Sequence, residues 1–493
     1  MFLENILTPV LSSINTFKDS NAFCISEVFY SYSDFGKQIS NIRGALCREN
    51  FVGKNVGLVA NDDIETYASI FALWLEGLAY VPLHPKQPIE RGLEIISQAD
   101  IELVLDSCDI PLFSTIKFIQ TKGLTETVTD LTPNQISDSE LAYILFTSGS
   151  TGKPKGVPIS RANLSAFVMS FWDIGYILGN EDRCLQPFDL TFDLSVSSYL
   201  LPILKGASVY TVPHEQIKYN YIAYLLDEYS LSFALMVPST IKYLKPYFNE
   251  LILPALKYSL FCGEALPLGL LAEWSKCVPN AVIDNVYGPT EDTIFCSIYR
   301  YERECVNKAH NGVISIGKSM TSGSMIVVDE DNNQLNHNEQ GELCLSGNQL
   351  TPGYWNNPEK NKEAFFVNAK GQRYYRTGDV CYMDIDGDFM YCGRKDTQVK
   401  IQGYRIELGE IEYHTRNFIL GKNAVAIPYE DSIGNTEIAL FIECEQSTNE
   451  LLIEYLKKII PSYMIPSKLI NVSVFPLNQN GKIDKNILKT QLN

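Results

Sequence analysis

Residues 141–156 read LAYILFTSGSTGKPKG. The first six are mostly apolar, as in a buried β-strand, and the ten that follow hold three glycines, four hydroxyl side chains and two lysines. Glycine lets a backbone approach a ligand closely, hydroxyls and N–H groups donate to phosphoryl oxygens, and lysine adds positive charge. Open α/β sheets bind ligands at the carboxyl ends of their strands, so the stretch predicts an α/β fold with a nucleotide loop.

The loop differs from the nucleotide loop of P-loop NTPases. Lys153 is followed by Pro154 instead of Ser or Thr, and no glycine stands five residues before Gly152. A flexible surface turn is the alternative that the loop alone leaves open, because short stretches of Gly, Ser and Thr are typical of turns.

The composition predicts a globular, acidic protein of several domains. The chain has 493 residues, of which 45% are apolar and 11% aromatic, more than one ordinary core accommodates. Its net charge of −18 and pI near 4.8 argue against a nucleic-acid or anionic-membrane surface, which needs clustered Lys and Arg.

The cysteine pattern and the N-terminus indicate a cytoplasmic location without membrane insertion. The twelve cysteines include no C-x-x-C pair, and His310 after Cys305 stands alone, so no zinc knuckle is expected. Apolar residues between Phe2 and Ile14 follow helical spacing and predict a packing helix instead of a secretion signal. No apolar run approaches the roughly 18 residues of a membrane span.

The order of predicted elements divides the chain in two. Strand-like runs alternate with helix-like stretches such as Ile64–Glu76 over about residues 50–390, and the pattern changes to a small α+β arrangement after Asp396. We therefore predict a large N-terminal domain of several subdomains over residues 1–395 and a C-terminal domain over residues 396–493. The junction is expected to be a tight hinge at residues 393–396.

Several further motifs follow in a fixed order. They are WLEGLAYVP at 74–82, the glycine-rich loop, FDLS at 192–195, NVYGPTE at 285–291, GEL at 341–343, YRTGD at 375–379, residues 393–412, PSYMIP at 461–466 and NGKID at 480–484. This order resembles the adenylate-forming (ANL) superfamily over nearly the whole chain. It is most similar to the amino-acid adenylation domains of nonribosomal peptide synthetases and to stand-alone D-alanine:D-alanyl carrier protein ligases.

The resemblance implies an acyl-adenylate-forming fold, a small mobile C-terminal domain and two half-reactions that need ATP and Mg²⁺. ATP would first convert a carboxylate to an acyl-adenylate, and the acyl group would then pass to a phosphopantetheine thiol. Attack of a carboxylate on a phosphate brings like charges together, so positioned donors and cations are needed.

The resemblance also assigns nucleotide-binding residues. Thr290 would contact the α-phosphate, Glu291 would bind Mg²⁺, and Tyr287 would stack on the adenine. Asn285 would bond the edge of the base, while Asp379 would accept the ribose hydroxyls beside Arg394. The β- and γ-phosphates would be held by Thr147, Ser148, Gly149, Thr151, Gly152 and Lys155.

Lys482 is the implied catalytic cation of the first half-reaction. It follows Asn480-Gly481, a typical hairpin dipeptide, so an exposed lysine after a turn is the alternative for this motif alone. The resemblance places a hinge at Asp396 and has Gly403 and Tyr404 line a thiol tunnel after rotation. Gln402 stands where peptide synthetases commonly carry arginine.

Asp193 is the implied partner of a substrate ammonium and therefore points to an α-amino acid. A helix N-cap is the alternative role for an aspartate in FDLS. The resemblance implies a mainly apolar substrate pocket, with Lys482 closing it, that comprises Asp193, Leu194, Ser197, Met236, Leu260, Cys262, Val286, Ile294 and Phe295.

This pocket favours a small or apolar amino acid. The run FCGEALP at 261–267 is similar to D-alanine ligases, so D-alanine is the first expectation, although Ser197 replaces a larger apolar residue. A ligase for proline or another apolar amino acid in natural-product biosynthesis is the close alternative. An acyl- or aryl-CoA synthetase and a non-catalytic nucleotide-binding scaffold are further alternatives. The chain has no Gly-Gly-x-Ser carrier segment, so we expect a separate phosphopantetheinylated carrier protein as partner.

Overall fold

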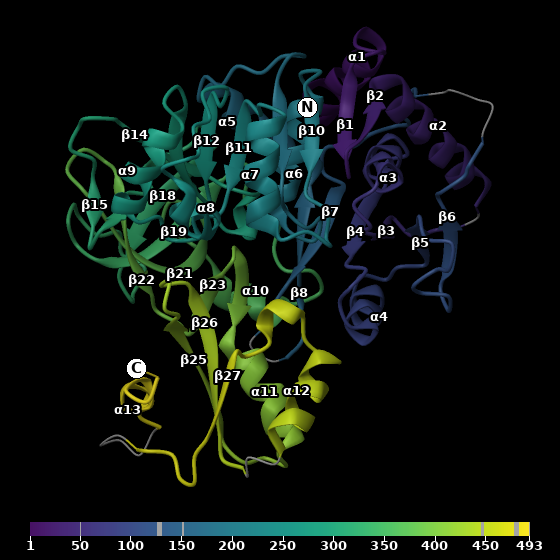
Figure 1. The fold of residues 1–493 in the computed structure, drawn as a ribbon. Helices are drawn as coiled ribbons and strands as arrows, with labels where there is room; N and C mark the ends of the chain where they lie inside the picture. Colours follow the sequence, from purple (N-terminus) through teal and green to yellow (C-terminus); the bar gives the residue numbers. More distant parts are fainter. Residues whose placement is uncertain (50, 126–130, 150–151, 445–447, 478–482, 493) are drawn as a thin grey trace. The chain divides into compact units, whose positions relative to one another are not determined.

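The computed structural model describes residues 1–49, 51–125, 131–149, 152–444, 448–477 and 483–492, and these form two compact units (Figure 1). Unit 1 comprises Met1–Pro85, Ile96–Leu145 and Gly156–Lys395. Unit 2 comprises Lys86–Ile95, Phe146–Lys155 and Asp396–Asn493. The glycine-rich loop therefore packs with the C-terminal part of the chain, although the sequence placed it in the N-terminal domain.

A nine-stranded sheet forms the centre of unit 1. Its order is β17-β14-β13-β12-β11-β9-β10-β1-β2, and the pairs from β13 to β1 are parallel. The strands are β1 (Asn21–Ile25), β2 (Val28–Ser31), β9 (Arg183–Gln186), β10 (Ser208–Thr211), β11 (Phe233–Met236), β12 (Tyr258–Phe261), β13 (Val282–Tyr287), β14 (Ser297–Tyr301) and β17 (Lys318–Ser319).

Helices cover both faces of this sheet, because its strands bury both sides. Along β11, Phe233 and Leu235 pack in one core cluster with α5 and α6, whereas Ala234 and Met236 pack in a second with α7, α8 and α9. The helices are α5 (Arg161–Asp173), α6 (Asp193–Ile203), α7 (Lys218–Glu228), α8 (Pro238–Leu244) and α9 (Leu268–Cys277), with a short 3₁₀ turn η2 (Lys245–Tyr247).

A six-stranded sheet has the order β6-β5-β3-β4-β7-β8. Helix α3 begins after Asp63, whose carboxylate accepts the N–H of Thr66 at 2.8 Å as an N-cap. The elements are β3 (Asn55–Val59), β4 (Ala79–Leu83), β5 (Leu103–Asp106), β6 (Lys117–Gln120), β7 (Leu141–Thr147), β8 (Lys155–Ser160), α2 (Tyr32–Arg48), α3 (Ile64–Leu75) and α4 (Ile89–Gln98).

The N-terminus forms the predicted packing helix. It begins as a π-helical turn, η1 (Leu3–Leu7), and continues as α1 (Thr8–Thr16). Phe2, Ile6 and Val10 are buried in the main core cluster, where Phe2 contacts Trp74 edge-on at 5.5 Å.

A smaller antiparallel sheet completes unit 1, with order β18-β19-β21-β20 and β22 paired to β21. Its elements are β18 (Gly323–Val328), β19 (Gly341–Gly347), α10 (Pro358–Ala364), β20 (Phe365–Val367), β21 (Arg373–Met383) and β22 (Phe389–Arg394). A separate two-stranded ribbon joins β15 (Ala309–His310) to β16 (Val313–Ile314).

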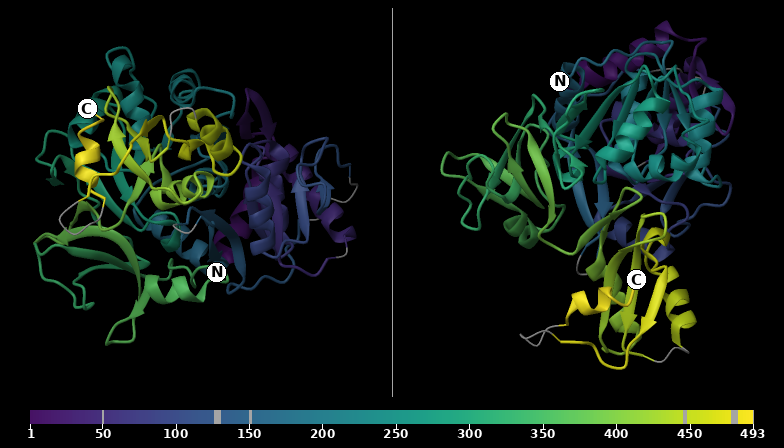
Figure 2. Two further views of the ribbon diagram at one scale, coloured as in Figure 1. Left: turned by 90° about the horizontal axis from the view of Figure 1, so that it is seen from below. Right: turned by 60° about the vertical axis from the view of Figure 1, so that its left-hand side comes forward.

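The C-terminal segment of unit 2 is the α+β arrangement that the sequence predicts (Figure 2). A hairpin, β23–β24, precedes α11, and the sheet β25-β26-β27 packs against α11 and α12 through its own core cluster. The elements are β23 (Gln398–Ile401), β24 (Tyr404–Glu407), α11 (Leu408–Phe418), β25 (Ala424–Glu430), β26 (Thr436–Ile442), α12 (Asn449–Lys457), η5 (Ser462–Met464), β27 (Lys468–Asn471) and α13 (Lys485–Lys489).

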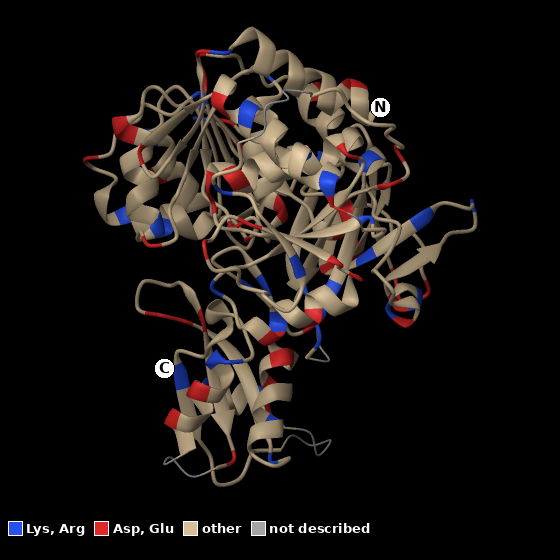
Figure 3. Cartoon of the chain, turned by 90° about the vertical axis from the view of Figure 1, so that its right-hand side faces the viewer, with Lys and Arg blue, Asp and Glu red and all other residues tan. Residues whose placement is uncertain are grey.

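Acidic and basic residues are interspersed along the described chain (Figure 3). Within the described ranges, every helix is too short or too polar to cross a membrane.

Candidate active site

The glycine-rich loop is held within unit 2 by hydrogen bonds to polar groups of β24 and α11. The Ser148 hydroxyl donates to the carbonyl of Arg405 at 2.7 Å, and the Gly149 N–H donates to Oε2 of Glu410 at 3.1 Å. Lys155 Nζ lies 3.5 Å from Oε1 of Glu407. The three donor groups of this loop are of the kind that binds phosphoryl oxygens. In the structure they contact oxygens of the protein, namely one backbone carbonyl and two carboxylates.

Two glycines of the loop are required by close packing. A Cβ on Gly149 would lie 2.0 Å from the carbonyl oxygen of Lys153. Gly152 has a φ of +83°, and a Cβ there would lie 2.5 Å from the ring of Tyr413. Thr147 ends β7, and its buried hydroxyl has no hydrogen-bond partner within the described part of the chain. A ligand hydrogen bond would satisfy that hydroxyl.

The predicted hinge and tunnel residues lie on or before the β23–β24 hairpin. Asp396 Oδ1 accepts the N–H of Gln398 at 3.1 Å, just before β23. Gln402 and Gly403 have φ values of 51° and 83°, so they form a two-residue turn in which glycine is favoured. Tyr404 stacks on Tyr463 with ring centroids 3.9 Å apart.

Asp379 and its neighbours form a buried polar cluster in unit 1. Asp379 pairs with Arg394 across β21 and β22, and Arg394 Nη1 donates to its Oδ1 at 2.6 Å. The Tyr287 hydroxyl donates to Oδ2 of the same carboxylate. Burial, followed by the charge of Asp379, raises the pKa of Tyr287 well above its usual value, so the phenol stays protonated as the donor.

Asn285, Thr290 and Glu291 lie on the same segment as Tyr287. Asn285 Nδ2 donates to the carbonyl of Ser315 at 2.8 Å, which fixes the orientation of the amide. Thr290 and Glu291 lie in a 3₁₀ turn, η3 (Thr290–Asp292), which begins three residues after the end of β13. The Glu291 carboxylate is fully buried and accepts the hydroxyl of Tyr354 at 2.6 Å.

Asp193 is the first residue of α6 and is 6% exposed. The N-cap of α6 is Phe192, without a side-chain hydrogen bond, so the alternative role of Asp193 as N-cap is wrong. Serine hydroxyls of this helix form hydrogen bonds with the backbone of the helix itself. One of them, Ser197, donates to the carbonyl of Leu194 at 2.8 Å. The hydroxyl of Ser197 is therefore already engaged as a donor, which makes this part of the predicted pocket more apolar than the sequence suggests.

Most predicted pocket residues lie in one core cluster. Six of them belong to this cluster, and each of the six is at most 2% exposed: Leu194, Leu260, Cys262, Val286, Ile294 and Phe295. Phe295 packs edge-on against Phe167 of α5 at 4.9 Å. Met236 differs, because its side chain belongs to the cluster on the other face of the sheet, although the Cys262 N–H donates to its carbonyl at 3.0 Å.

Gln349 is a buried residue that the sequence analysis missed. Thr293 and Ile294 have φ values of 50° and 76°, which is strained for β-branched residues. The Gln349 amide spans this turn: Nε2 donates to the carbonyls of Asp292 at 3.2 Å, Thr293 at 3.4 Å and Phe295 at 2.9 Å. Gln349 therefore positions the segment that links the Glu291 turn to the pocket residues Ile294 and Phe295.

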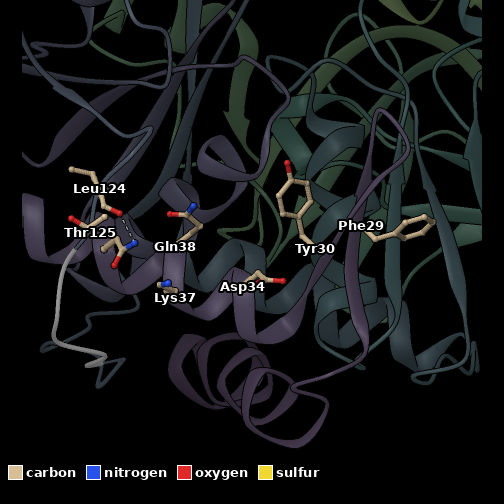
Figure 4. Close-up of a pocket in the computed structure, with 8 residues that line it drawn as sticks. Phe29, Tyr30, Asp34, Lys37, Gln38, Leu124 and Thr125 are labelled. Atoms are coloured by element: carbon tan, nitrogen blue, oxygen red, sulfur yellow. Dashed lines mark hydrogen bonds between the residues drawn. The ribbon is translucent and has the colours of Figure 1, made fainter.

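A surface pocket beside α2 is lined by none of the predicted site residues (Figure 4). Tyr30, Asp34, Lys37 and Gln38 line it, and Asn41 Nδ2 donates to the carbonyl of Leu124 at 2.8 Å along its wall. Two predicted site residues, Thr151 and Lys482, lie outside the described residues.

Comparison with known proteins decides the family. A model for AMP-binding enzymes matches residues 12–355. The chain belongs to this AMP-binding enzyme family. A D-alanine–D-alanyl carrier protein ligase of Lacticaseibacillus paracasei is 32% identical, with both chains covered completely.

Larger members of the AMP-binding enzyme family are also similar. Tyrocidine synthase 2 of Brevibacillus parabrevis is 30% identical over 95% of this chain, which spans only 13% of that protein. The adenylation domain AlmE of Vibrio cholerae, solved in complex with glycyl-adenosine-5'-phosphate, has 26% identity and a TM-score of 0.87 over 98% of this chain and 97% of its own. The predicted superfamily and the α/β fold class are confirmed.

Proposed function

We propose that this protein is an AMP-forming ligase that activates a small or apolar amino acid, with D-alanine as the first candidate. The amino acid would become an aminoacyl-adenylate at the expense of ATP and would then pass to the phosphopantetheine thiol of a separate carrier protein. The full-length similarity to D-alanine–D-alanyl carrier protein ligases supports this proposal.

The observation that carries the proposal is the buried carboxylate of Asp193 at the first turn of α6, next to an apolar pocket wall. In the substrate complex the ammonium would pair with this carboxylate, and an analogue that lacks the ammonium would lose about 3–5 kcal/mol of binding free energy. We therefore expect amino acids to be preferred over their des-amino analogues by about 10²- to 10³-fold.

The remaining roles follow the family resemblance. Asp379, held by Tyr287 and Arg394, would accept the ribose hydroxyls, and Asn285 would bond the adenine edge. Ser148, Gly149, Gly152 and Lys155 would exchange their present oxygen acceptors for phosphoryl oxygens. The donor and acceptor types at each position suit these partners.

Glu291 and the neighbouring Thr290 would hold Mg²⁺ and the α-phosphate. The carboxylate and the hydroxyl are hard oxygen donors, which Mg²⁺ prefers, so the residues fit this ion. Bound Mg²⁺ would neutralise phosphate charge during the reaction. Tyr354 orients the Glu291 carboxylate through its hydrogen bond.

An amino-acid-dependent ATP–pyrophosphate exchange panel tests the proposal. It should contain both enantiomers of alanine, glycine, proline and serine, with propionate as the des-amino analogue. Glycine is included because the AlmE complex contains a glycyl-adenylate. We expect exchange with one small amino acid and at least about 100-fold less with propionate. Asp193→Asn should remove most of this preference.

Two further measurements separate the alternatives. Lys482→Ala should abolish exchange while transfer from supplied aminoacyl-adenylate to carrier protein persists, and unchanged exchange would exclude Lys482 as the catalytic cation. Propionate or an aryl acid as the best substrate, with CoA as acceptor, would indicate an acyl-CoA synthetase. Failure of exchange with every acid would indicate a non-catalytic scaffold.

A further inference from the structure

Two histidines and an aspartate meet in unit 1 at the carboxyl ends of strands from two sheets. His84 directly follows β4 of the six-stranded sheet. Asp189 and His214 follow β9 and β10, which are neighbours in the nine-stranded sheet. None of the three belongs to the predicted adenylation site, so their convergence needs a separate explanation.

The donor atoms of these residues are close enough to share one ion. His214 Nδ1 lies 3.3 Å from Asp189 Oδ1, and His84 Nε2 lies 3.9 Å from the same oxygen. One ligand atom from each residue lies within 4.8 Å of the other two, and the imidazole centroids are 5.6 Å apart. In a tetrahedral zinc site with bonds of about 2.0–2.1 Å, ligand atoms are about 3.3 Å apart. Small side-chain rotations would therefore complete the site.

The surrounding charges suit a cation. Asp62, which follows β3, interacts electrostatically with His214 and Asp189, and its Oδ1 accepts the hydroxyl of Tyr67 at 2.5 Å. The Lys218 ammonium interacts with both carboxylates. The two carboxyl groups outnumber the one ammonium, so this cluster can offset the charge of a bound cation.

We propose that His84, Asp189 and His214 form a binding site for a divalent transition-metal ion of the zinc class. Two imidazole nitrogens and one carboxylate oxygen are zinc ligands, and a three-residue set leaves a fourth position for water or hydroxide. Asp62, which interacts electrostatically with His214 and Asp189, would add a carboxyl group near the bound ion without ligating it. Mg²⁺ and Ca²⁺ fit less well, because they prefer oxygen ligands.

The metal would fix the segment that leads into α6. The Phe192 N–H donates to the carbonyl of Asp189 at 2.9 Å, so a turn connects this ligand to the helix that begins at Asp193. The bound metal would also link the segment after β4 to the segments after β9 and β10 through its three ligands. The proposed effect of the metal is to fix this segment, and metal binding does not depend on whether the proposed adenylation occurs.

Metal analysis of the whole protein tests this proposal. The protein is stripped with a chelator, reloaded with Zn²⁺ or Co²⁺ and dialysed, and the bound metal is measured by mass spectrometry. The chain has five histidines, which allows a matched pair of double variants: His84→Asn with His214→Asn, and His310→Asn with His337→Asn. Asp189→Asn provides a single variant in case the double substitution at the site impairs folding.

The expected result is about one tightly bound ion per wild-type chain, unchanged in the His310/His337 control. The His84/His214 variant and Asp189→Asn should bind at least about 100-fold more weakly. Zn²⁺ should raise the melting temperature of the stripped wild type but not that of the site variants. Bound Co²⁺ should show visible d–d bands without a thiolate charge-transfer band.

Three outcomes would overturn the proposal. The wild type could fail to retain either metal, or the site variants could retain it as tightly as the wild type. A dominant thiolate charge-transfer band would instead assign the metal to some of the twelve cysteines.

Discussion

The backbone N–H of Gly149 donates to one carboxylate oxygen of Glu410 at 3.1 Å, while Arg91 Nη1 donates to the other at 2.7 Å. Glu410 is therefore shared between the predicted phosphate loop and a buried guanidinium. An anionic oxygen already occupies a loop donor that we assign to a phosphoryl oxygen. If the loop binds ATP as proposed, the bond from Gly149 must break, whereas the Arg91–Glu410 pair can persist.

We predict that Glu410→Ala destabilises unit 2 by about 3–5 kcal/mol, because Arg91 would stay buried without its counter-ion. The side chains of Arg91 and Glu410 are 6% and 0% exposed. Hydrogen exchange of the α11 amides measures this loss, and the combined Arg91→Met and Glu410→Met substitution should restore much of the protection. Glu454→Ala, which alters an exposed side chain of α12, is the control. Equal exchange in Glu410→Ala and the control would show that the ion pair contributes little.

We predict that Gly149→Ala impairs ATP binding without unfolding the protein. The added methyl would lie 2.0 Å from the Lys153 carbonyl oxygen, so the loop backbone must move. Pyrophosphate exchange should require at least about 100-fold more ATP, a loss of about 2.7 kcal/mol of binding free energy. Gly269→Ala on α9 is the matched control, because its methyl would meet no atom within 4 Å. Wild-type ATP dependence in Gly149→Ala would remove this loop from the nucleotide site.

Much of the fold was predictable because it rests on local patterns. The apolar run at 141–146 is the start of β7, and the helix predicted at Ile64–Glu76 is α3, which ends at Leu75. The α+β arrangement predicted after Asp396 is the hairpin β23–β24, the helices α11 and α12 and the sheet β25-β26-β27. The order of the strands within a sheet could not be predicted in this way. For example, β1 pairs with β10 and places Phe23 beside Val209, and no local sequence pattern encodes so distant a partner.

The site was predictable only where a motif carries it. Family motifs pointed to Asp379 and Arg394, which the structure brings into contact, and to six apolar residues that lie in one buried core cluster. Gln349 belongs to no motif, and its role depends on carbonyls about 55 residues away in sequence. Buried amides of this kind are found only when the backbone groups that they satisfy are located. Met236 is buried in a different cluster from the other predicted pocket residues, because its side chain lies on the other face of β11.

We predict that Gln349→Leu raises the amino-acid KM more than the ATP KM. The substitution removes the donor from the carbonyls of Asp292, Thr293 and Phe295, and each buried unsatisfied group costs about 1–3 kcal/mol. The strained turn should relax and displace Ile294. Exchange kinetics with each substrate varied in turn measure the effect, with Gln372→Leu on the surface as the control. Equal increases in both KM values would indicate general destabilisation instead of a positioning role.

We predict that His414 makes the protein sensitive to acid. Burial lowers the pKa of this imidazole below its usual 6.5, although Glu410 opposes the shift. The unfolded chain therefore takes up a proton here at a higher pH than the folded protein, so the free energy of unfolding falls as the pH drops from about 7 to about 5. His414→Gln removes this proton uptake and should give a shallower dependence of the melting temperature on pH in this range. His310→Gln, which alters a half-buried side chain of the two-stranded β15–β16 ribbon, should retain the wild-type slope. If His414→Gln and His310→Gln melt with the same pH dependence as the wild type, another group causes the acid sensitivity.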